Sequence, residues 1–118
     1  MIKGIGIDHI ELGRINQIIK RNDRFVQRIL TEKERGQLAA YKNESRQIEF
    51  VAGRFAAKEA LGKAMGTGIG KVSFQDIEIS RSEHGAPEMK LRGYEHMKIW
   101  VSISHSEQHA IAQVIIEE

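Results

Sequence analysis

One segment of the chain brings together charged side chains and glycines in a pattern that suits a phosphorylated ligand. Residues 53–70 read GRFAAKEALGKAMGTGIG, in which Arg54, Lys58, Glu59 and Lys63 precede three glycines within five residues. Glycine lets backbone N–H groups approach a ligand closely because it carries no side chain. A carboxylate beside several cations and bare backbone donors suits a polyphosphate bound through a metal ion. The segment therefore indicates phosphoryl chemistry.

Two carboxylates are candidate ligands for that metal. Asp8 follows the glycine-spaced apolar segment Ile2–Ile7, which we expect to be a short strand, and Glu59 lies in the predicted central helix. Mg²⁺ usually binds through one or two carboxylates plus substrate phosphates, which fits this pair. Each residue also has a structural alternative: Asp8 could cap a helix starting near Glu11, and Glu59 could form a surface ion pair with Lys63 four residues later. The small and apolar neighbours of Glu59 favour burial, and a buried carboxylate needs a partner.

The glycines after this helix match neither of the common nucleotide-binding loops. A P-loop would need glycine where Met65 stands, and the dinucleotide fingerprint would need glycine in place of Lys71. Gly66 is also explained as an ordinary end of the helix. His105, between serines at the end of a predicted strand, could be structural or solvated, or could belong to the rim of a phosphate site.

The N-terminal third carries four arginines that could share one surface. If residues 11–30 form a continuous helix with 3.6 residues per turn, these arginines lie within an arc of about 80°. Such a face could dock an acidic partner, with Ile18 and Phe25 as apolar anchors, or it could simply be solvated. The arginines are Arg14, Arg21, Arg24 and Arg28.

The elements that must position these residues read as helices followed by antiparallel strands, which predicts an α+β fold. Periodicity and capping signals predict helices from Glu11 onward with an interruption at Asn22–Asp23, from the Thr31–Glu34 capping box towards Lys42, and over Gln47–Met65. Alternating apolar residues predict strands around Phe74–Ile79, at Met89 and Leu91, and in a hairpin made of Ile99–Ile103 and Ala110–Ile116.

Length and composition limit the classes of protein to consider. A chain of 118 residues is expected to form one domain, and its net charge of +2 is too small to indicate a nucleic-acid binder. The absence of cysteine excludes disulfides, thiolate metal sites and cysteine nucleophiles. No apolar run approaches the ~20 residues that span a bilayer, and no signal-peptide pattern is present, so we expect a cytoplasmic protein.

Taken together, these segments resemble the holo-acyl-carrier-protein synthases, small bacterial 4′-phosphopantetheinyl transferases. The resemblance covers nearly the whole chain, and its specificity comes from the order and spacing of several short segments. One departure is His9, where the family usually has an aliphatic residue. The matching segments are Gly4–Asp8, Gly53–Ala60, Gly66–Gly68 and Ser102–Ser106.

This resemblance implies an activity and an assembly. Such an enzyme transfers 4′-phosphopantetheine from coenzyme A to a serine of apo-acyl carrier protein, using Mg²⁺ and releasing adenosine 3′,5′-bisphosphate, in fatty acid biosynthesis. It also implies the 4′-phosphopantetheinyl transferase fold over residues 1–118, with an N-terminal strand and helices packed on a mainly antiparallel sheet. The family forms homotrimers with active sites between protomers.

The same resemblance assigns roles to individual residues. Asp8 and Glu59 would hold Mg²⁺ and, with Lys63, form the catalytic group, in which Lys63 neutralises the bridging or leaving oxygen. The arginine face with Ile18 and Phe25 would dock the acidic carrier protein. Coenzyme A would be held by Arg54, Lys63, Gly66, Thr67, Gly68, His105 and Ser106.

Two other classes of function remain as alternatives. A non-catalytic RNA-binding domain could use the arginine face, but aromatic residues make up only 6% of the chain and no R-G-F-type strand motif is present. A purely structural oligomer would leave Asp8 and Glu59 unexplained. Another alternative is a phosphopantetheinyl transferase with a different carrier, such as the transferase module of a larger synthase. The short length favours a free-standing enzyme. We therefore expect neither a nucleic-acid nor a membrane partner.

Overall fold

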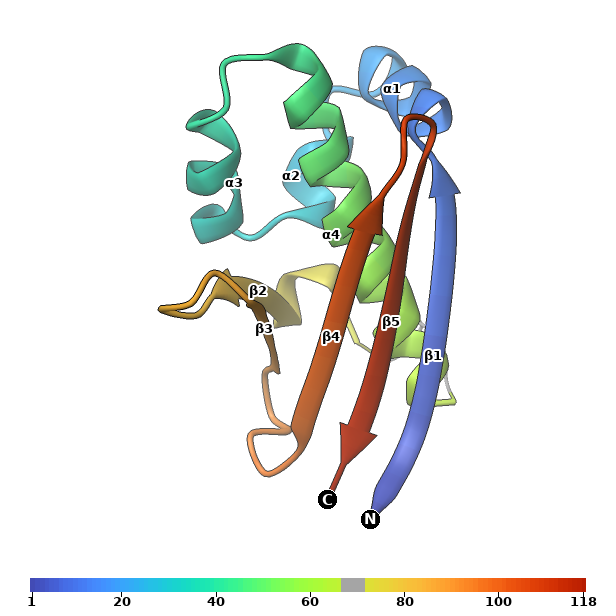
Figure 1. The fold of residues 1–118 in the computed structure, drawn as a ribbon. Helices are drawn as coiled ribbons and strands as arrows, with labels where there is room; N and C mark the ends of the chain where they lie inside the picture. The colour runs from blue at the N-terminus through green and yellow to red at the C-terminus, as the bar shows by residue number, and fades with distance from the viewer. Residues whose placement is uncertain (67–71) are drawn as a thin grey trace.

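A three-stranded antiparallel sheet with one long helix across its face forms the centre of the molecule (Figure 1). The computed structural model describes residues 1–66 and 72–118. The strand order is β1–β5–β4, so the first strand and the C-terminal hairpin make one sheet and both termini lie at the same end (Figure 1). The elements are β1 (Ile2–Glu11), β4 (Lys98–His105), β5 (His109–Glu117) and the helix α4 (Glu44–Ala64).

The remaining elements pack beside α4 and form a helical region and a small hairpin (Figure 1). The hairpin is a second antiparallel sheet of two strands. The expected α+β class is confirmed: after the N-terminal strand β1, the helices come first and the other antiparallel strands later. These elements are α1 (Leu12–Arg21), α2 (Phe25–Ile29), α3 (Glu32–Ala39), the 3₁₀ helix η2 (Phe74–Asp76), β2 (Ile77–Arg81) and β3 (Pro87–Leu91).

Local capping signals explain where α3 and α4 begin. The predicted capping box is present: Thr31 accepts a hydrogen bond from the Glu34 N–H, and the Glu34 carboxylate accepts one from the Thr31 N–H. The α4 helix begins before the predicted Gln47, because the Asn43 side chain accepts hydrogen bonds from the N–H groups of Ser45 and Arg46. The preceding helix ends at Ala39, short of the predicted Lys42.

The glycines of β1 allow this strand to lie directly against α4. A Cβ on Gly4 would clash with the carbonyl oxygen of Ala64, and one on Gly6 with that of Ala60. Because side chains alternate along a strand, Ile5 and Ile7 face away from the helix and are 58% and 53% exposed. Their apolar character therefore does not contribute to the core of this chain.

A buried ion pair joins the helical region to the small hairpin. The Lys58 ammonium donates to Glu34 Oε1 at 2.7 Å and to the carbonyl oxygens of Ile29 at 2.7 Å and Phe74 at 3.1 Å. Glu34 Oε2 accepts the backbone N–H of Ile79 at 2.8 Å. Lys58, one of the cations in the glycine-rich segment, thus holds α2, α3, α4 and η2 together.

Among the helices of the described ranges, none has both the length and the apolar character needed to span a membrane.

Candidate active site

Asp8 and Lys63 meet where β1 passes along α4. The strand continues to Glu11, so Asp8 lies within β1 and not at its end as expected. Its Oδ1 accepts a hydrogen bond from Lys63 Nζ at 2.9 Å, and Lys63 also donates to the Ile7 carbonyl oxygen at 3.0 Å. Glu11 occupies the N-cap of α1, which overturns the alternative that Asp8 caps this helix. The carboxylate is therefore left to interact with side chains of α4.

Glu59 lies beside the same pair and carries an unfavourable charge. Burial raises the pKa of Glu59 from its ordinary value, the nearby Asp8 carboxylate raises this pKa further, and Lys63 opposes both effects. The ion pair that the structure contains is Lys63 with Asp8, not Lys63 with Glu59 as the surface-pair alternative required. Two carboxylates thus share one partly exposed cation, and a further cation would be favoured there.

The donor set at this position fits Mg²⁺ as an incomplete cage. Within residues 1–66 and 72–118, no group of three or more metal-ligating side chains occurs. Mg²⁺ does not require one, because it usually keeps several waters and shares one or two carboxylates with substrate phosphates. Asp8 and Glu59 supply the hard oxygen atoms that such a shared site needs.

The predicted glycine contacts fall at the C-terminal end of α4. The helix ends at Ala64 with Met65 as its C-cap. Gly66 follows with a φ of 77°, a left-handed conformation that favours glycine and confirms its predicted role as a helix stop. The predicted coenzyme-binding residues Thr67 and Gly68 lie outside the described residues.

His105 and Ser106 lie on the opposite edge of the sheet from Asp8. His105 is the last residue of β4. The Nε2 atom of its ring is 2.9 Å from the carbonyl oxygen of Glu49 near the start of α4. The Ser106 hydroxyl accepts the N–H of His109 at 3.1 Å and helps to close the turn between β4 and β5. The strands β1 and β4 are separated by β5, so one chain does not bring His105 and Asp8 together.

Arg54 is buried on another face of α4, away from Lys63. Nine residues separate it from Lys63, which places the two about 180° apart around a helix of 3.6 residues per turn. Its side chain is 5% exposed, with the guanidinium 4.3 Å from the centre of the Phe50 ring. Burial and then the neighbouring Arg81 lower the pKa of Arg54 from its ordinary value. Within one chain, Arg54 and Lys63 therefore lie on opposite faces of α4, and the role of both residues in holding coenzyme A stays a prediction.

The predicted arginine face is divided between two short helices. α1 ends at Arg21 and α2 starts at Phe25, so the continuous helix assumed for the 80° arc does not exist. Phe25 is only 8% exposed, and its ring lies tilted against that of Phe55 with the ring centroids 5.8 Å apart, which corrects its role as a free apolar anchor. Ile18 is half-buried. The four arginines remain exposed: Arg14, Arg21, Arg24 and Arg28.

The sequence and the fold both match known proteins. The family model of the 4′-phosphopantetheinyl transferase superfamily matches residues 4–114. The chain belongs to this superfamily. It is 55% identical to the holo-[acyl-carrier-protein] synthase of Oceanobacillus iheyensis, covering 99% of this chain and 98% of the relative. It is 52% identical to the synthase of Listeria monocytogenes, covering 99% of both.

Solved structures of such synthases share the fold. One from Bacillus anthracis, in complex with CoA (3′,5′-ADP), has a TM-score of 0.89 at 52% identity and covers 98% of this chain and 96% of that one. One from Neisseria meningitidis has a TM-score of 0.89 at 35% identity and covers both chains completely. The predicted family and fold are confirmed. Membership of a transferase family favours an enzyme over the RNA-binding and structural alternatives.

The sequence interpretation did not separate the cations of α4 by function. Lys58 was grouped with Arg54 and Lys63, although it forms a fully buried pair with Glu34. A helical wheel of the segment distinguishes these faces, because 100° per residue places Arg54 opposite Lys63. The partner of Lys58 comes from another helix, and no local pattern in the sequence identifies it.

Proposed function

We propose that this protein transfers the 4′-phosphopantetheine group of coenzyme A to a serine of an apo-acyl carrier protein, in fatty acid biosynthesis. The observation that carries this proposal is the cluster of Asp8, Glu59 and Lys63, where two carboxylates and a partly exposed ammonium meet. Relatives at 55% and 52% identity are named holo-[acyl-carrier-protein] synthases, and the Bacillus anthracis structure contains CoA (3′,5′-ADP). We treat residues 1–118 as one transferase domain.

The chemistry requires charge neutralisation more than covalent participation of the protein. The serine oxygen forms a bond to the phosphorus of the pantetheine phosphate while the bond from this phosphorus to adenosine 3′,5′-bisphosphate breaks. The serine proton passes to a water molecule, and negative charge grows on the leaving oxygen. Asp8 and Glu59 would hold Mg²⁺, which supplies positive charge at the diphosphate. The Lys63 side chain is 56% exposed, so its ammonium can turn from Asp8 to the leaving oxygen. Lys63 thereby stabilises the transition state more than the bound substrate.

A homotrimer with sites between protomers is part of the proposal. His105 and Asp8 lie on strands at opposite edges of the sheet, about 10 Å apart at two strand spacings, with α4 packed across the face between them. Two copies could place both groups against one coenzyme, with Asp8, Glu59 and Lys63 from one protomer and His105 and Ser106 from the next. The outward sheet face supports such packing because its large apolar side chains are 38–58% exposed: Ile5, Ile7, Trp100 and Ile111.

The carrier protein would dock on the arginine-bearing helices. Arg14 and Arg21 are exposed on α1, and an acidic carrier would be attracted by their charge. Phe25 would support this surface from beneath by its packing against Phe55. The proposed enzyme is cytoplasmic and acts without a nucleic-acid or membrane partner.

Mass spectrometry of an apo-acyl carrier protein incubated with the protein, coenzyme A and Mg²⁺ tests this function. We expect a mass increase of one phosphopantetheine, loss of the increase in EDTA, and recovery with excess Mg²⁺. Asp8→Ala and Glu59→Ala should each abolish transfer with an unchanged circular dichroism spectrum, whereas Glu88→Ala, at an exposed position of β3, should not. Several bacterial carriers that all stay unmodified would refute the proposal.

A further inference from the structure

Gly53 is buried in the middle of α4, where glycine destabilises a helix relative to alanine. The space around it gives a reason for the absence of a side chain. A Cβ at Gly53 would lie 3.0 Å from His105 Nε2 and 3.1 Å from Ile103 Cγ2, closer than side chains normally come. By contrast, a Cβ at Gly36, the glycine of α3, would meet nothing within 4 Å. Gly53 is therefore a glycine that the packing requires.

Two side chains of β4 occupy the space that Gly53 leaves. Ile103 and His105 are two residues apart on this strand, so both side chains point to the face of the sheet that packs against α4 (Figure 1). Ile103 packs against the core of the sheet and α4. The ring of His105, at the exposed end of the strand, instead reaches the backbone of the helix, with Nε2 2.9 Å from the Glu49 carbonyl oxygen.

The carbonyl that His105 contacts is the one that a side chain at position 53 would cover. In an α-helix the Glu49 oxygen accepts the N–H of the residue four positions later, which is Gly53. The Cα–Cβ bond of that later residue tilts towards the helix N-terminus, so its side chain lies over the preceding turn. Without a Cβ at Gly53, the second lone pair of the Glu49 oxygen stays open to a donor from β4. The missing side chain and the histidine contact are thus parts of one arrangement.

This contact fixes which ring nitrogen of His105 carries the proton in the neutral ring. A carbonyl oxygen only accepts hydrogen bonds, so Nε2 must be the donor in the 2.9 Å contact. The other nitrogen, Nδ1, lies on the far side of the ring carbon Cε1, and it is the nitrogen that remains for a ligand. It accepts a hydrogen bond in the neutral ring and donates one when the ring is protonated.

We propose that Gly53 is a positioning residue for coenzyme A: it keeps His105 on the Glu49 carbonyl with the proton on Nε2, so that Nδ1 meets the ligand. The contact with the coenzyme rests on the function proposed above. When Nδ1 also carries a proton, it can donate to a phosphate oxygen while Nε2 stays bound to Glu49, so both N–H groups have an acceptor. Gly53 acts through the ring and needs no contact with the coenzyme.

Nitrogen-15 NMR of the histidine side chains in the assembled protein, without coenzyme, tests this geometry at about pH 9, where histidine rings are neutral. The His105 signal is assigned by its loss in His105→Gln, and we expect the coupling pattern of a ring protonated on Nε2. Gly53→Ala should change this signal to a mixture of the two tautomers, whereas Gly36→Ala should leave it as in the wild type. A wild-type ring protonated on Nδ1, or an unchanged signal in Gly53→Ala, would overturn the proposal.

Calorimetric titration with coenzyme A tests the consequence for binding. Gly53→Ala should bind coenzyme A about tenfold more weakly, with kcat at saturating coenzyme within about twofold of wild type, because the Asp8–Lys63 pair is untouched. Gly36→Ala should bind within about twofold of wild type on the same scale. In a His105→Ala background, Gly53→Ala should cause no further loss, because its effect passes through this ring. Unchanged affinity in Gly53→Ala, or losses that add in the double variant, would overturn the proposal.

Two replacements of His105 identify the nitrogen that meets the coenzyme, and they leave α4 unchanged if Gly53→Ala fails to fold. The amide nitrogen of asparagine lies as many bonds from the backbone as Nδ1, and that of glutamine as many as Nε2. His105→Asn should therefore retain more affinity for coenzyme A than His105→Gln, and the reverse order would overturn the assignment. Failure of the carrier-modification assay would refute the transferase proposal, whereas the NMR measurement tests Gly53 without any coenzyme.

Discussion

Two lysines of α4 form ion pairs with carboxylates. The pairs differ in exposure and in whether all of their hydrogen-bonding positions are occupied. Lys58 and Glu34 are both 0% exposed, 2.7 Å apart, and their remaining hydrogen-bonding positions are taken by backbone groups. The side chains of Lys63 and Asp8 are 56% and 16% exposed and 2.9 Å apart. Glu59, whose pKa is raised, lies beside them. The first arrangement is complete and holds elements together. The second has one more carboxylate than it has cations, and its ammonium is exposed enough to move. A phosphoryl-transfer site needs both features.

The largest expected effect comes from breaking the complete pair. Lys58→Met leaves the Glu34 carboxylate buried without its cation, which we expect to cost about 3–5 kcal/mol in the free energy of unfolding. The double variant Lys58→Met/Glu34→Gln should recover part of this loss, because it removes the stranded charge while an amide oxygen can still accept from Ile79. Urea unfolding of the single and double variants measures the difference. A single variant within about 1 kcal/mol of wild type would show that the pair is not what joins these elements.

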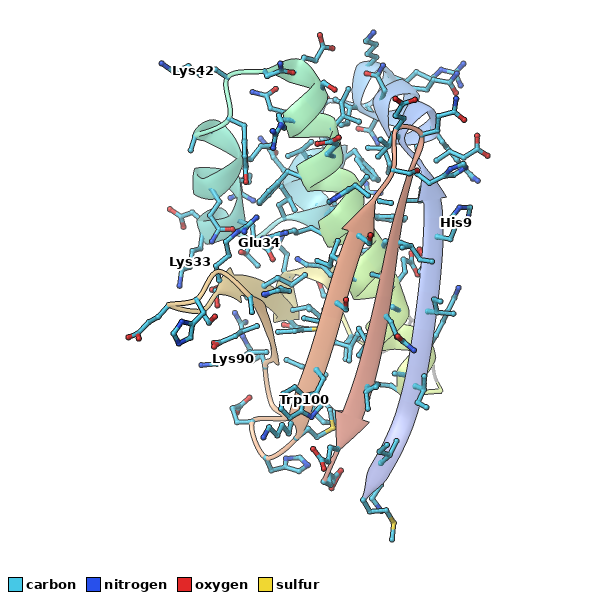
Figure 2. The ribbon with its side chains drawn as sticks, in the orientation of Figure 1. His9, Lys33, Glu34, Lys42, Lys90 and Trp100 are labelled. Atoms are coloured by element: carbon cyan, nitrogen blue, oxygen red, sulfur yellow. The ribbon has the colours of Figure 1, made fainter. Side chains whose placement is uncertain are left out.

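Substitutions in the incomplete pair of Lys63 and Asp8 should change the rate of transfer and not the stability of the protein. Lys63→Ala should lower kcat about 100-fold, equivalent to ~2.7 kcal/mol of barrier, with little change in coenzyme A affinity, because the ammonium meets charge that grows during transfer. Lys63→Arg should recover only part of the rate, since a broad guanidinium replaces a compact ammonium. Lys90→Ala, an exposed lysine of β3 shown in Figure 2, is the matched control. A kcat within twofold of wild type would return Lys63 to a surface ion pair.

The contrast between the lysines also marks what the sequence can reveal. Short-range signals were sufficient for the capping box of Thr31 and Glu34 and for the C-terminal hairpin, because both depend on residues close in the chain. The partners of Lys58 and Lys63 come from α3 and β1, so they follow from tertiary packing. The arginine arc required a continuous helix, whereas α1 ends at Arg21 and α2 begins at Phe25, with the predicted interruption at Asn22 and Asp23 between them.

Local sequence patterns also could not predict which face of β1 is buried. The apolar residues Ile5 and Ile7 fit a buried strand face, but the alternating glycines Gly4 and Gly6 face α4, so the isoleucines face outward. Strand alternation gives two faces without saying which one is buried. In the proposed assembly a second copy would cover the outward face, and a single sequence carries no direct signal for that.

A smaller effect should appear in the pH dependence of stability. Because the pKa of Glu59 is raised in the folded protein, its stabilising contribution is present below the unfolded value near 4.5 and is lost as the pH rises through the folded value. Without Mg²⁺, Glu59→Gln should therefore melt at a higher temperature than wild type at pH 7, and the difference should disappear as the pH falls to about 4.

Melting curves between pH 4 and 8 measure this effect, with Glu88→Gln as an exposed control that should show no such trend. Added Mg²⁺ and coenzyme A should reduce the advantage of Glu59→Gln, because they relieve the charge in the wild type alone. A wild type that is more stable than Glu59→Gln at pH 7 without metal would contradict the crowding of the two carboxylates.

The smallest expected effect concerns the carrier surface, where each charge is exposed. Arg14→Glu or Arg21→Glu should raise the KM for the carrier about two- to fivefold, since single surface pairs contribute at most about 1 kcal/mol and are screened by salt. The kcat and the coenzyme A affinity should stay at wild-type values, because α1 does not contribute to the Asp8–Lys63 cluster. Steady-state kinetics at 50 and 300 mM salt checks both points, with Arg92→Glu, one residue after β3, as the matched reversal. If Arg92→Glu raises the carrier KM as much as Arg14→Glu, the carrier responds to net charge and has no preferred docking face on α1.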